Sequence, residues 1–197
     1  MTKQGEKNDN SSELENPDPT GKAVKLEHVG GFLRRGPLRK AVALKNDCLC
    51  ISLNKELKTG IHILSCKFEK SSQCAIGISK ASHKIPYPCD TDQDPDTQSM
   101  LSYYANGYIC YKKRYEGRNS SFGNEELVTM ELNCKAQTLH FFDSHGEQQR
   151  LFVRGINEPV KFFIYLFYED WSVTITSVKE LSAATSKDIP DSESIEW

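Results

Sequence analysis

The feature that most constrains this chain is a repeated alternation of apolar and polar residues over short segments. The apolar residues of three such segments are Leu49, Ile51 and Leu53; Val128, Met130 and Leu132; and Trp171, Val173 and Ile175. Successive side chains of a β-strand point to opposite faces of the sheet. This period of two therefore predicts strands with one face in a core.

Two further segments, 61–68 and 160–167, are apolar at both parities, which is typical of strands that are covered on both faces. Turn-forming residues, such as Asn106 and Gly107, separate nearly every pair of these segments. About ten short strands at this spacing predict an antiparallel sandwich or barrel rather than an α/β fold with long crossover helices. The segment 124–132 also fits a helix, and that alternative stays open.

The length of 197 residues suits one domain with polar ends. Residues 1–22 contain hardly any large apolar side chain, and residues 182–197 have a similar polar and acidic character. Such segments bury too little apolar surface to offset the entropy cost of ordering. We expect a disordered N-terminal tail over 1–22, a domain over 23–181 and a flexible acidic C-terminal tail over 182–197. Trp197 is interpreted as an incidental tail residue rather than an anchor for a partner.

Two connections are long for a compact domain, namely residues 80–99 and residues 112–126. The first contains three of the eight prolines and many acidic residues, without any periodicity. Loops of this length on a rigid scaffold are often functional or mobile.

Between about residues 39 and 178 the order of motifs resembles the SPRY domain family. The matching elements are a strand at 60–68, a short strand at 74–79, a Tyr-rich hairpin at 102–112, a segment at 122–133, an element at 137–146 and closing strands at 160–167 and 171–178. The chain departs from the family pattern at 124–126, in place of the usual Gly-Asp, and at 144–145, where an Asn would precede Gly146. These are turn positions that Gly, Asp and Asn share with other polar residues, so they bear on the subfamily more than on the fold.

The resemblance implies an all-β fold, an antiparallel two-sheet β-sandwich of the SPRY or concanavalin-like jelly-roll type. In this family the loops at one end of the sandwich bind short peptides or protein surfaces. Such domains often act as substrate receptors beside ubiquitin-ligase modules. No RING, B-box or SOCS-box segment can be identified in the tails, so we expect any link to a ubiquitin ligase to be made in trans.

Aromatic and charged residues on exposed loops are the expected binding groups, because they provide large contact area or several donors at low ordering cost. The predicted partner-binding residues lie around the Tyr-rich hairpin and before the last strand: Tyr104, Tyr111, Arg114, Tyr115, Tyr168 and Asp170. The family resemblance brings these two regions together at one end of the sandwich. The alternative for Tyr104 and Tyr111 is packing in the core, and core packing is favoured for Trp171.

The net charge of −2 is uneven, because each tail carries −3 and the middle carries about +4. This charge is too mild and scattered to indicate a nucleic-acid partner, since phosphate-binding surfaces concentrate Lys and Arg on one face. Two basic clusters stand out: Arg34, Arg35, Arg39 and Lys40; and Lys112, Lys113, Arg114 and Arg118. We interpret both as solvated positive surface, with an acidic-peptide site as the alternative.

No nucleophile elbow, P-loop or HExxH pattern occurs, so we predict no catalytic residue and no cofactor. The alternating carboxylates at 90, 92, 94 and 96 resemble a calcium loop, but the Gly and the bidentate Glu of an EF-hand are missing. Cys48 and Cys50 share a strand face, yet a zinc site needs two further ligands. We therefore expect no metal site.

We expect a cytoplasmic or nuclear protein without membrane insertion. The first residues lack the apolar stretch of a signal peptide, and no apolar run approaches the roughly 20 residues that cross a bilayer. In that reducing setting the seven cysteines are predicted to be free thiols.

The function that the sequence favours is a non-catalytic protein-interaction module, monomeric on its own. It is expected to bind a peptide or a protein surface through loops at one end of the sandwich, as an adaptor or substrate receptor. Two alternatives stay open: a carbohydrate-binding, lectin-like sandwich, and a structural subunit of a larger complex.

Overall fold

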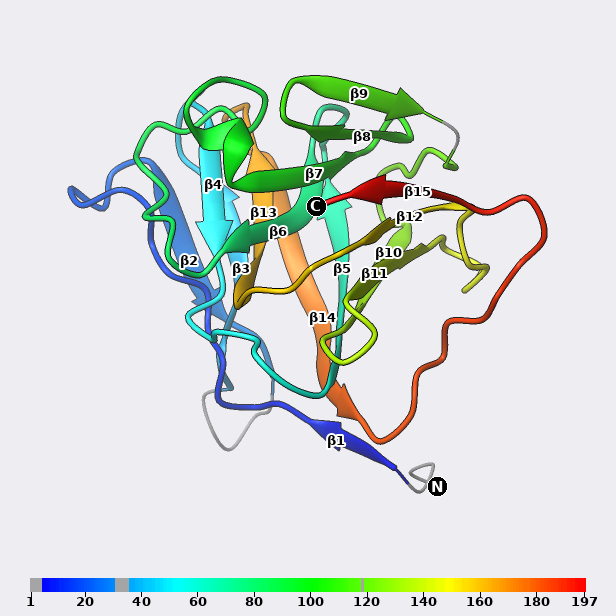
Figure 1. Ribbon diagram of the computed structural model, residues 1–197. Helices are drawn as coiled ribbons and strands as arrows, with labels where there is room; N and C mark the ends of the chain where they lie inside the picture. Colours follow the sequence, from blue (N-terminus) through cyan, green and yellow to red (C-terminus); the bar gives the residue numbers. More distant parts are fainter. Residues whose placement is uncertain (1–4, 31–35, 118) are drawn as a thin grey trace.

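The computed structural model describes residues 5–30, 36–117 and 119–197, which form fifteen strands and one short 3-10 helix (Figure 1). The elements are β1 (Glu6–Asn8), β2 (Val24–His28), β3 (Leu38–Ala43), β4 (Leu49–Ser52), β5 (Ile61–Glu69), β6 (Ala75–Lys80), η1 (Asp96–Gln98), β7 (Met100–Tyr104), β8 (Tyr108–Tyr111), β9 (Arg114–Gly117), β10 (Leu127–Asn133), β11 (Thr138–Phe142), β12 (Leu151–Arg154), β13 (Val160–Leu166), β14 (Ser172–Leu181) and β15 (Glu193–Glu196). The described part of the chain contains no helix long and apolar enough to cross a membrane.

The strands form two sheets, which confirms the predicted two-sheet β-sandwich. The first sheet runs in the order β15-β12-β11-β10-β5-β14-β3-β2, with β1 paired to β14, and the second runs β4-β13-β6-β7-β8-β9. Neighbouring strands are antiparallel except for the parallel pair β12 and β15. The segment 124–132 is not a helix, because β10 pairs with β5 on one side and β11 on the other.

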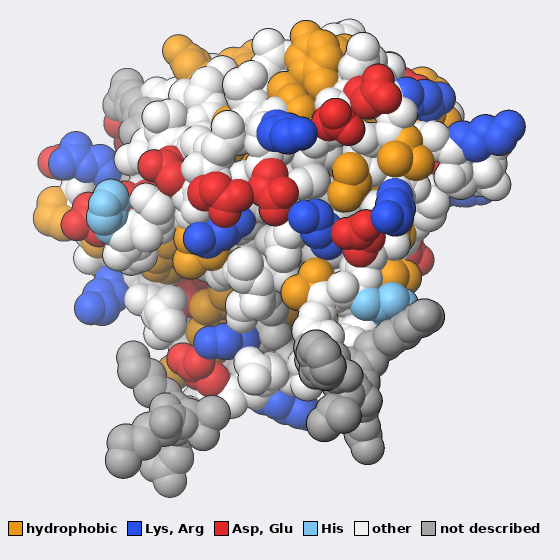
Figure 2. Space-filling view, turned by 180° about the vertical axis from the view of Figure 1, so that it is seen from behind, with side chains coloured by type: hydrophobic (Ala, Val, Ile, Leu, Met, Phe, Trp, Pro, Cys, Tyr) orange, Lys and Arg blue, Asp and Glu red, His pale blue; other side chains and the backbone are white. Residues whose placement is uncertain are grey.

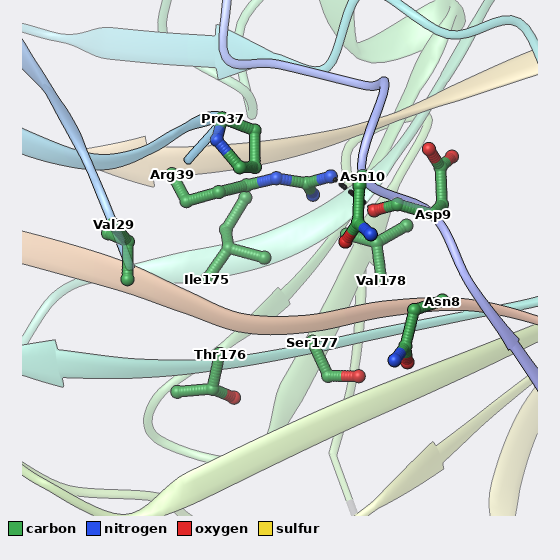
Figure 3. A pocket seen from close by; sticks show the side chains of 10 residues that line it. All are labelled: Asn8, Asp9, Asn10, Val29, Pro37, Arg39, Ile175, Thr176, Ser177 and Val178. Carbon is green, nitrogen blue, oxygen red and sulfur yellow. Dashed lines mark hydrogen bonds between the residues drawn. The ribbon is translucent and has the colours of Figure 1, made fainter. Parts of the chain in front are cut away.

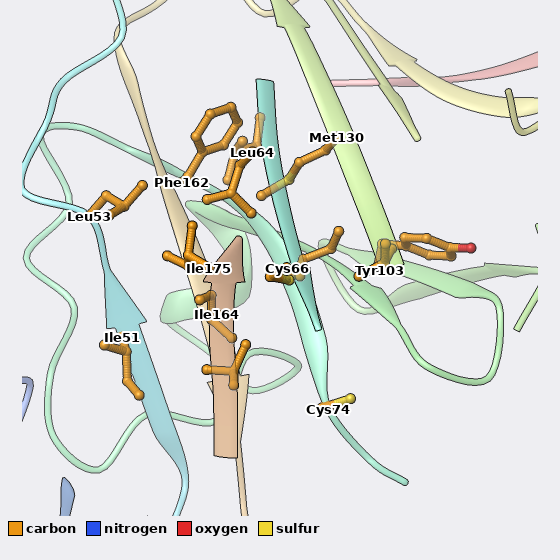
Figure 4. Packing of buried hydrophobic residues seen from close by; sticks show 14 of the residues in the cluster. Ile51, Leu53, Leu64, Cys66, Cys74, Tyr103, Met130, Phe162, Ile164 and Ile175 are labelled. Carbon is orange, nitrogen blue, oxygen red and sulfur yellow. The ribbon is translucent and has the colours of Figure 1, made fainter. Parts of the chain in front are cut away.

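The apolar side chains of the alternating segments fill the space between the two sheets. Figure 4 shows side chains from both sheets in this core: Ile51, Phe162 and Ile164 from the second sheet, and Leu64, Cys66, Met130 and Ile175 from the first. Trp171 is buried as well, as the sequence predicts. The local period of two is therefore realised as one continuous core.

A second, smaller apolar cluster lies on the outer face of the second sheet. Phe163 and Tyr165 on β13 pack there with Cys50, and Cys89 and Met100 join them from the 80–99 connection and the start of β7. β13 is therefore buried on both faces, as its sequence predicts. β5 was expected to be similar, but its outer face stays partly exposed.

All seven cysteines are free thiols, and five of them are buried. Burial raises the pKa of the Cys74 thiol to about 12. The structure thus agrees with the prediction of free thiols.

The N-terminal segment differs from the disordered tail predicted for residues 1–22. β1 adds to the end of β14, and Leu14 is buried in the main core. The buried Asp18 carboxylate accepts hydrogen bonds from backbone N–H groups between residues 20 and 23. These bonds outweigh burial and hold the pKa of Asp18 at about 2. Polar side chains of this segment hydrogen-bond to its backbone, so its polar composition does not indicate disorder. Residues 1–4 lie outside the described residues.

The C-terminal segment also differs from the flexible tail predicted for residues 182–197. In Figure 1 it runs around the outside of the molecule and returns as β15 beside β12. On the way, Thr185 and Ser186 donate backbone hydrogen bonds of 2.8 and 3.0 Å to the buried carboxylate of Glu131. Backbone pairing and a satisfied buried charge therefore help to hold this polar segment. We therefore propose that the domain includes both terminal segments.

Replacement of Asp9 by alanine is expected to loosen the N-terminal segment and to lower the free energy of unfolding by about 1–2 kcal/mol at neutral pH. The Asp9 carboxylate accepts a 2.9 Å hydrogen bond from Lys55 and the backbone N–H groups of Ser11 and Ser12. Burial opposes its charge, but these donors outweigh burial and hold the pKa of Asp9 well below its usual range. Urea denaturation at several pH values measures the effect.

The pH dependence of this stabilisation has a definite sign. A depressed carboxyl pKa stabilises the fold above the unfolded pKa of about 4, and the stabilisation is lost as the pH falls through the folded pKa. The difference between the wild type and Asp9→Ala should therefore shrink on acidification. A difference that stays constant down to about pH 2 would show that the carboxylate charge is not what holds this segment.

Candidate functional site

Several connections meet at one end of the second sheet and enclose a pocket of about 350 Å³. The β5–β6 turn, the 80–99 connection, the β7–β8 turn, β9 and the end of β13 all contribute to it. We call it the aromatic pocket and define it by six side chains: Asp90, Asp92, Tyr104, Tyr115, Tyr165 and Phe167.

The strand parity places the rings on the outer face of the second sheet. Tyr103 points into the main core and is buried, so Tyr104, the next residue of β7, points outward. The Tyr104 ring lies 6.4 Å from Tyr115 and 6.3 Å from Tyr165 between ring centroids, the latter in an edge-to-face contact. Three tyrosines from three strands therefore form one connected wall.

The hydroxyl groups of this wall are tied to the 80–99 connection. Tyr104 Oη and Thr91 Oγ1 are 2.5 Å apart, and Tyr115 donates a hydrogen bond to Asp92. Burial raises the pKa of both tyrosines, so their hydroxyls remain protonated donors at neutral pH. The connection predicted to be a long functional or mobile loop is therefore anchored to the sheet at this point.

Asp90 is a carboxylate in an unfavourable setting. Burial raises its pKa, and the neighbouring carboxyl of Asp92 raises it further. Each effect penalises the ionised form of Asp90.

Of the six residues predicted to bind a partner, only Tyr104 and Tyr115 line this pocket. Tyr168 lies next to it, with its exposed ring 4.7 Å from Phe167 and 4.8 Å from Trp171 between centroids. Asp170 lies in the following turn, exposed and with a φ of 64°.

Tyr111 and Arg114 line a different recess, of about 690 Å³, beside the C-terminal strand. Tyr111 is 4% exposed because the ring of Trp197 stacks on it, with centroids 4.9 Å apart and an angle of 1° between the planes. Arg114 is exposed at the edge of the same recess. The structure therefore shows Tyr111 packed, as in the alternative interpretation. Trp197 covers it and so is not an incidental tail residue.

Four members of the aromatic pocket were not predicted as partner-binding residues: Asp90, Asp92, Tyr165 and Phe167. Tyr165 and Phe167 share a parity opposite to the core-facing residues of 160–167, and a Tyr at the outer parity was a usable signal. The two aspartates were weighed only as members of a calcium loop.

The acidic connection does not gather its carboxylates around one point. Asp94 forms an ion pair of 2.6 Å with Lys113, and Asp96 lies 3.0 Å from His83. In the ranges that the structure covers, no three His, Cys, Asp or Glu side chains group as metal ligands.

Both basic clusters are only partly described, and the interpretation of the first as solvated surface needs correction at Arg39. This guanidinium is buried and donates hydrogen bonds to the Asp9 carbonyl and the Ser12 hydroxyl, because the N-terminal segment covers it. Figure 3 shows it beside a pocket of about 230 Å³, reaching toward Asn10. Arg34 and Arg35 lie outside the described residues, as does Arg118 of the second cluster.

The surface charges are mixed on the face seen in Figure 2, where acidic and basic side chains alternate over the surface. Lys112, Lys113 and Arg114 are exposed on the hairpin side, as predicted. Lys113 is neutralised by its ion pair with Asp94, so the basic character of this cluster is reduced.

Comparisons with family models and with curated proteins find no match for the sequence. Solved structures with a similar fold include the SPRY domain of human HERC1, at 15% identity and a TM-score of 0.56, covering 71% of this chain and 88% of that one. The TRIM65 PSpry domain matches at 11% identity and a TM-score of 0.60, covering 83% and 91%. Stonustoxin matches at 15% identity and a TM-score of 0.56, over 83% of this chain but 27% of that one.

Proposed function

Because this chain is a SPRY-like domain, we propose that it is a non-catalytic interaction module that binds a peptide or protein surface at the loop end of its sandwich. The aromatic pocket is the proposed centre of the binding surface. An adaptor role, in which the bound protein is presented to another component, is part of the same proposal.

The observation that carries the proposal is the concave, ring-lined site at the junction of several connections. Protein-binding energy concentrates in a few aromatic and charged residues that fill or line pockets, and small concave sites of about 300 Å³ and above are the usual ligand sites. Tyr115 is 49% exposed and Tyr168 is 41% exposed, so both offer ring surface to a partner. The rigid strands below them keep the ordering cost low.

Replacement of Tyr115 by a photo-crosslinking phenylalanine analogue is expected to capture the partner in cells, because this side chain lies at the rim of the aromatic pocket. Tyr108 is the matched control, since it is 46% exposed on the adjacent strand β8 but does not line the pocket. Mass spectrometry of the cross-linked products identifies the partner and the attached peptide.

The expected result is a defined set of cross-linked peptides from position 115 that is absent, or at least about tenfold weaker, at position 108. Equal capture from both positions would argue against a binding surface centred on the pocket. Capture of a glycan-bearing product alone would favour the lectin-like alternative.

A further inference from the structure

The aromatic pocket combines two kinds of groups that both attract cations. Its walls are the rings of Tyr104, Tyr115 and Tyr165, completed by Phe167, and the carboxyl groups of Asp90 and Asp92 lie among them. The face of an aromatic ring carries a negative quadrupole potential, which adds to the charge of a carboxylate. Its residues therefore present negative potential from several directions.

Among the described residues, the two carboxylates of the pocket have no cationic partner, whereas Asp94 in the same connection pairs with Lys113. Among the described residues, no ion pair is formed by Asp90 or Asp92, and Asp92 is held instead by hydrogen bonds from Tyr115 and Gln93. None of the described residues that line the pocket is a Lys, Arg or His. These residues therefore supply no counter-charge to the two carboxylates.

The groups that face Asp90 do not supply a positive charge either. They are Asp92 in its own connection, the thiols of Cys48, Cys50 and Cys110, and the hydroxyls of Tyr104 and Tyr165. Burial raises the pKa of each of these thiols and hydroxyls, so all of them are neutral at neutral pH. Among these described neighbours Asp92 is the one carboxyl group, and it raises the pKa of Asp90 further.

We propose that the aromatic pocket binds a basic side chain of the protein partner, arginine in preference to lysine. A planar guanidinium stacks on aromatic rings while its donors reach carboxylates, whereas an ammonium is a compact and strongly hydrated point charge. The volume of about 350 Å³ accommodates one such side chain. The inference rests on the function proposed above and specifies which residue type of the partner enters this site.

Titration of the full chain with N-acetyl-arginine methylamide, followed by NMR chemical shifts, tests the proposal directly. The same derivatives of citrulline and lysine are the comparison probes, because citrulline keeps the shape of arginine without the charge and lysine keeps the charge without the planar guanidinium. We expect millimolar binding of the arginine probe at the pocket, weaker binding of the lysine probe, and binding of the citrulline probe that is about tenfold weaker than that of arginine.

The variants Asp90→Asn and Asp92→Asn should each weaken binding of the arginine probe about tenfold, since they remove a charge and keep the shape. Asp94→Asn is the control, because Asp94 belongs to the same connection but pairs with Lys113 outside the pocket. Equal shifts with arginine and citrulline, or no shift at the pocket with tens of millimolar probe, would overturn the proposal. If cross-links from position 115 persist in that case, the interaction function stands and only the basic ligand is refuted.

The stability of Asp90→Asn as a function of pH provides a second readout, which a variant with a damaged fold would not give. A carboxyl with a raised folded-state pKa costs stability when it is ionised, so the wild type loses stability as the pH rises through that pKa. The variant should therefore resist urea better than the wild type at neutral pH and lose this advantage in acid. Weaker binding by a more stable protein supports a site kept for a cation, whereas a destabilised variant with unchanged arginine binding contradicts it.

Discussion

Replacement of Gly77 by alanine is expected to destabilise the fold by about 3 kcal/mol. Gly77 lies in β6, in register with Phe163 of β13 and Ser102 of β7. A Cβ atom at this position would lie 2.0 Å from the carbonyl oxygen of Leu101 and 2.8 Å from the ring of Phe163. A backbone oxygen cannot move away without breaking the pairing of β6 with β7, so the strands must separate.

The measurement is urea denaturation followed by far-ultraviolet circular dichroism. Gly123→Ala is the matched control, because a Cβ atom there meets the Glu126 carboxyl group at ordinary contact distances of 3.5 and 3.9 Å. The control should unfold within about 1 kcal/mol of the wild type. Equal stability of Gly77→Ala and Gly123→Ala would show that β6 and β7 are not packed as closely as described.

This substitution should also affect the aromatic pocket. The ring of Phe163 belongs to the outer apolar cluster together with Tyr165, and Tyr104 packs against that cluster. A displaced Phe163 ring is therefore expected to move Tyr165 and Tyr104, whose rings line the pocket. Cross-linking from position 115 should weaken in Gly77→Ala even where the protein remains folded.

Replacement of Trp197 by alanine is expected to release the C-terminal strand and to lower the free energy of unfolding by about 2 kcal/mol. The indole stacks on Tyr111, and its Nε1 donates a 3.0 Å hydrogen bond to Glu158. Its backbone N–H is bonded to the carbonyl of Arg154, at the end of β12. Trp197 thus contacts both sheets, the second through its ring and the first through its backbone.

Hydrogen exchange of the β12 amides and urea denaturation check this prediction. The parallel pairing with β15 covers one edge of β12, so its amides should exchange faster when the strand is released. Trp197→Phe is the matched control, since it keeps a ring for stacking and loses only the hydrogen bond to Glu158. Unchanged exchange and unchanged stability in Trp197→Ala would restore the interpretation of an incidental tail residue.

Part of the candidate site followed from the sequence, and part did not. Tyr104 and Tyr115 were selected from the sequence because aromatic residues on a Tyr-rich hairpin stand out, and both line the pocket. Asp90 and Asp92 were not assigned to it, because nothing local shows that Asp92 meets Tyr115, 23 residues further along the chain. The burial of Tyr111 was left open for the same reason, since its cover is a Trp that follows 86 residues later in the printed sequence.

By itself the alternation of apolar residues predicted an antiparallel sandwich or barrel, because it is a local pattern with one physical outcome, the burial of one face of each strand. The two-sheet form was implied by the resemblance to the SPRY family. Only the tertiary structure showed that strands near both ends pair with the first sheet and that carboxylates and rings line one pocket. Ordering of a polar segment depends on partners distant in the chain, such as Glu131 for residues 185 and 186 and Lys55 for Asp9. Composition records how much apolar surface a segment has, but not which backbone donors and charges it will meet.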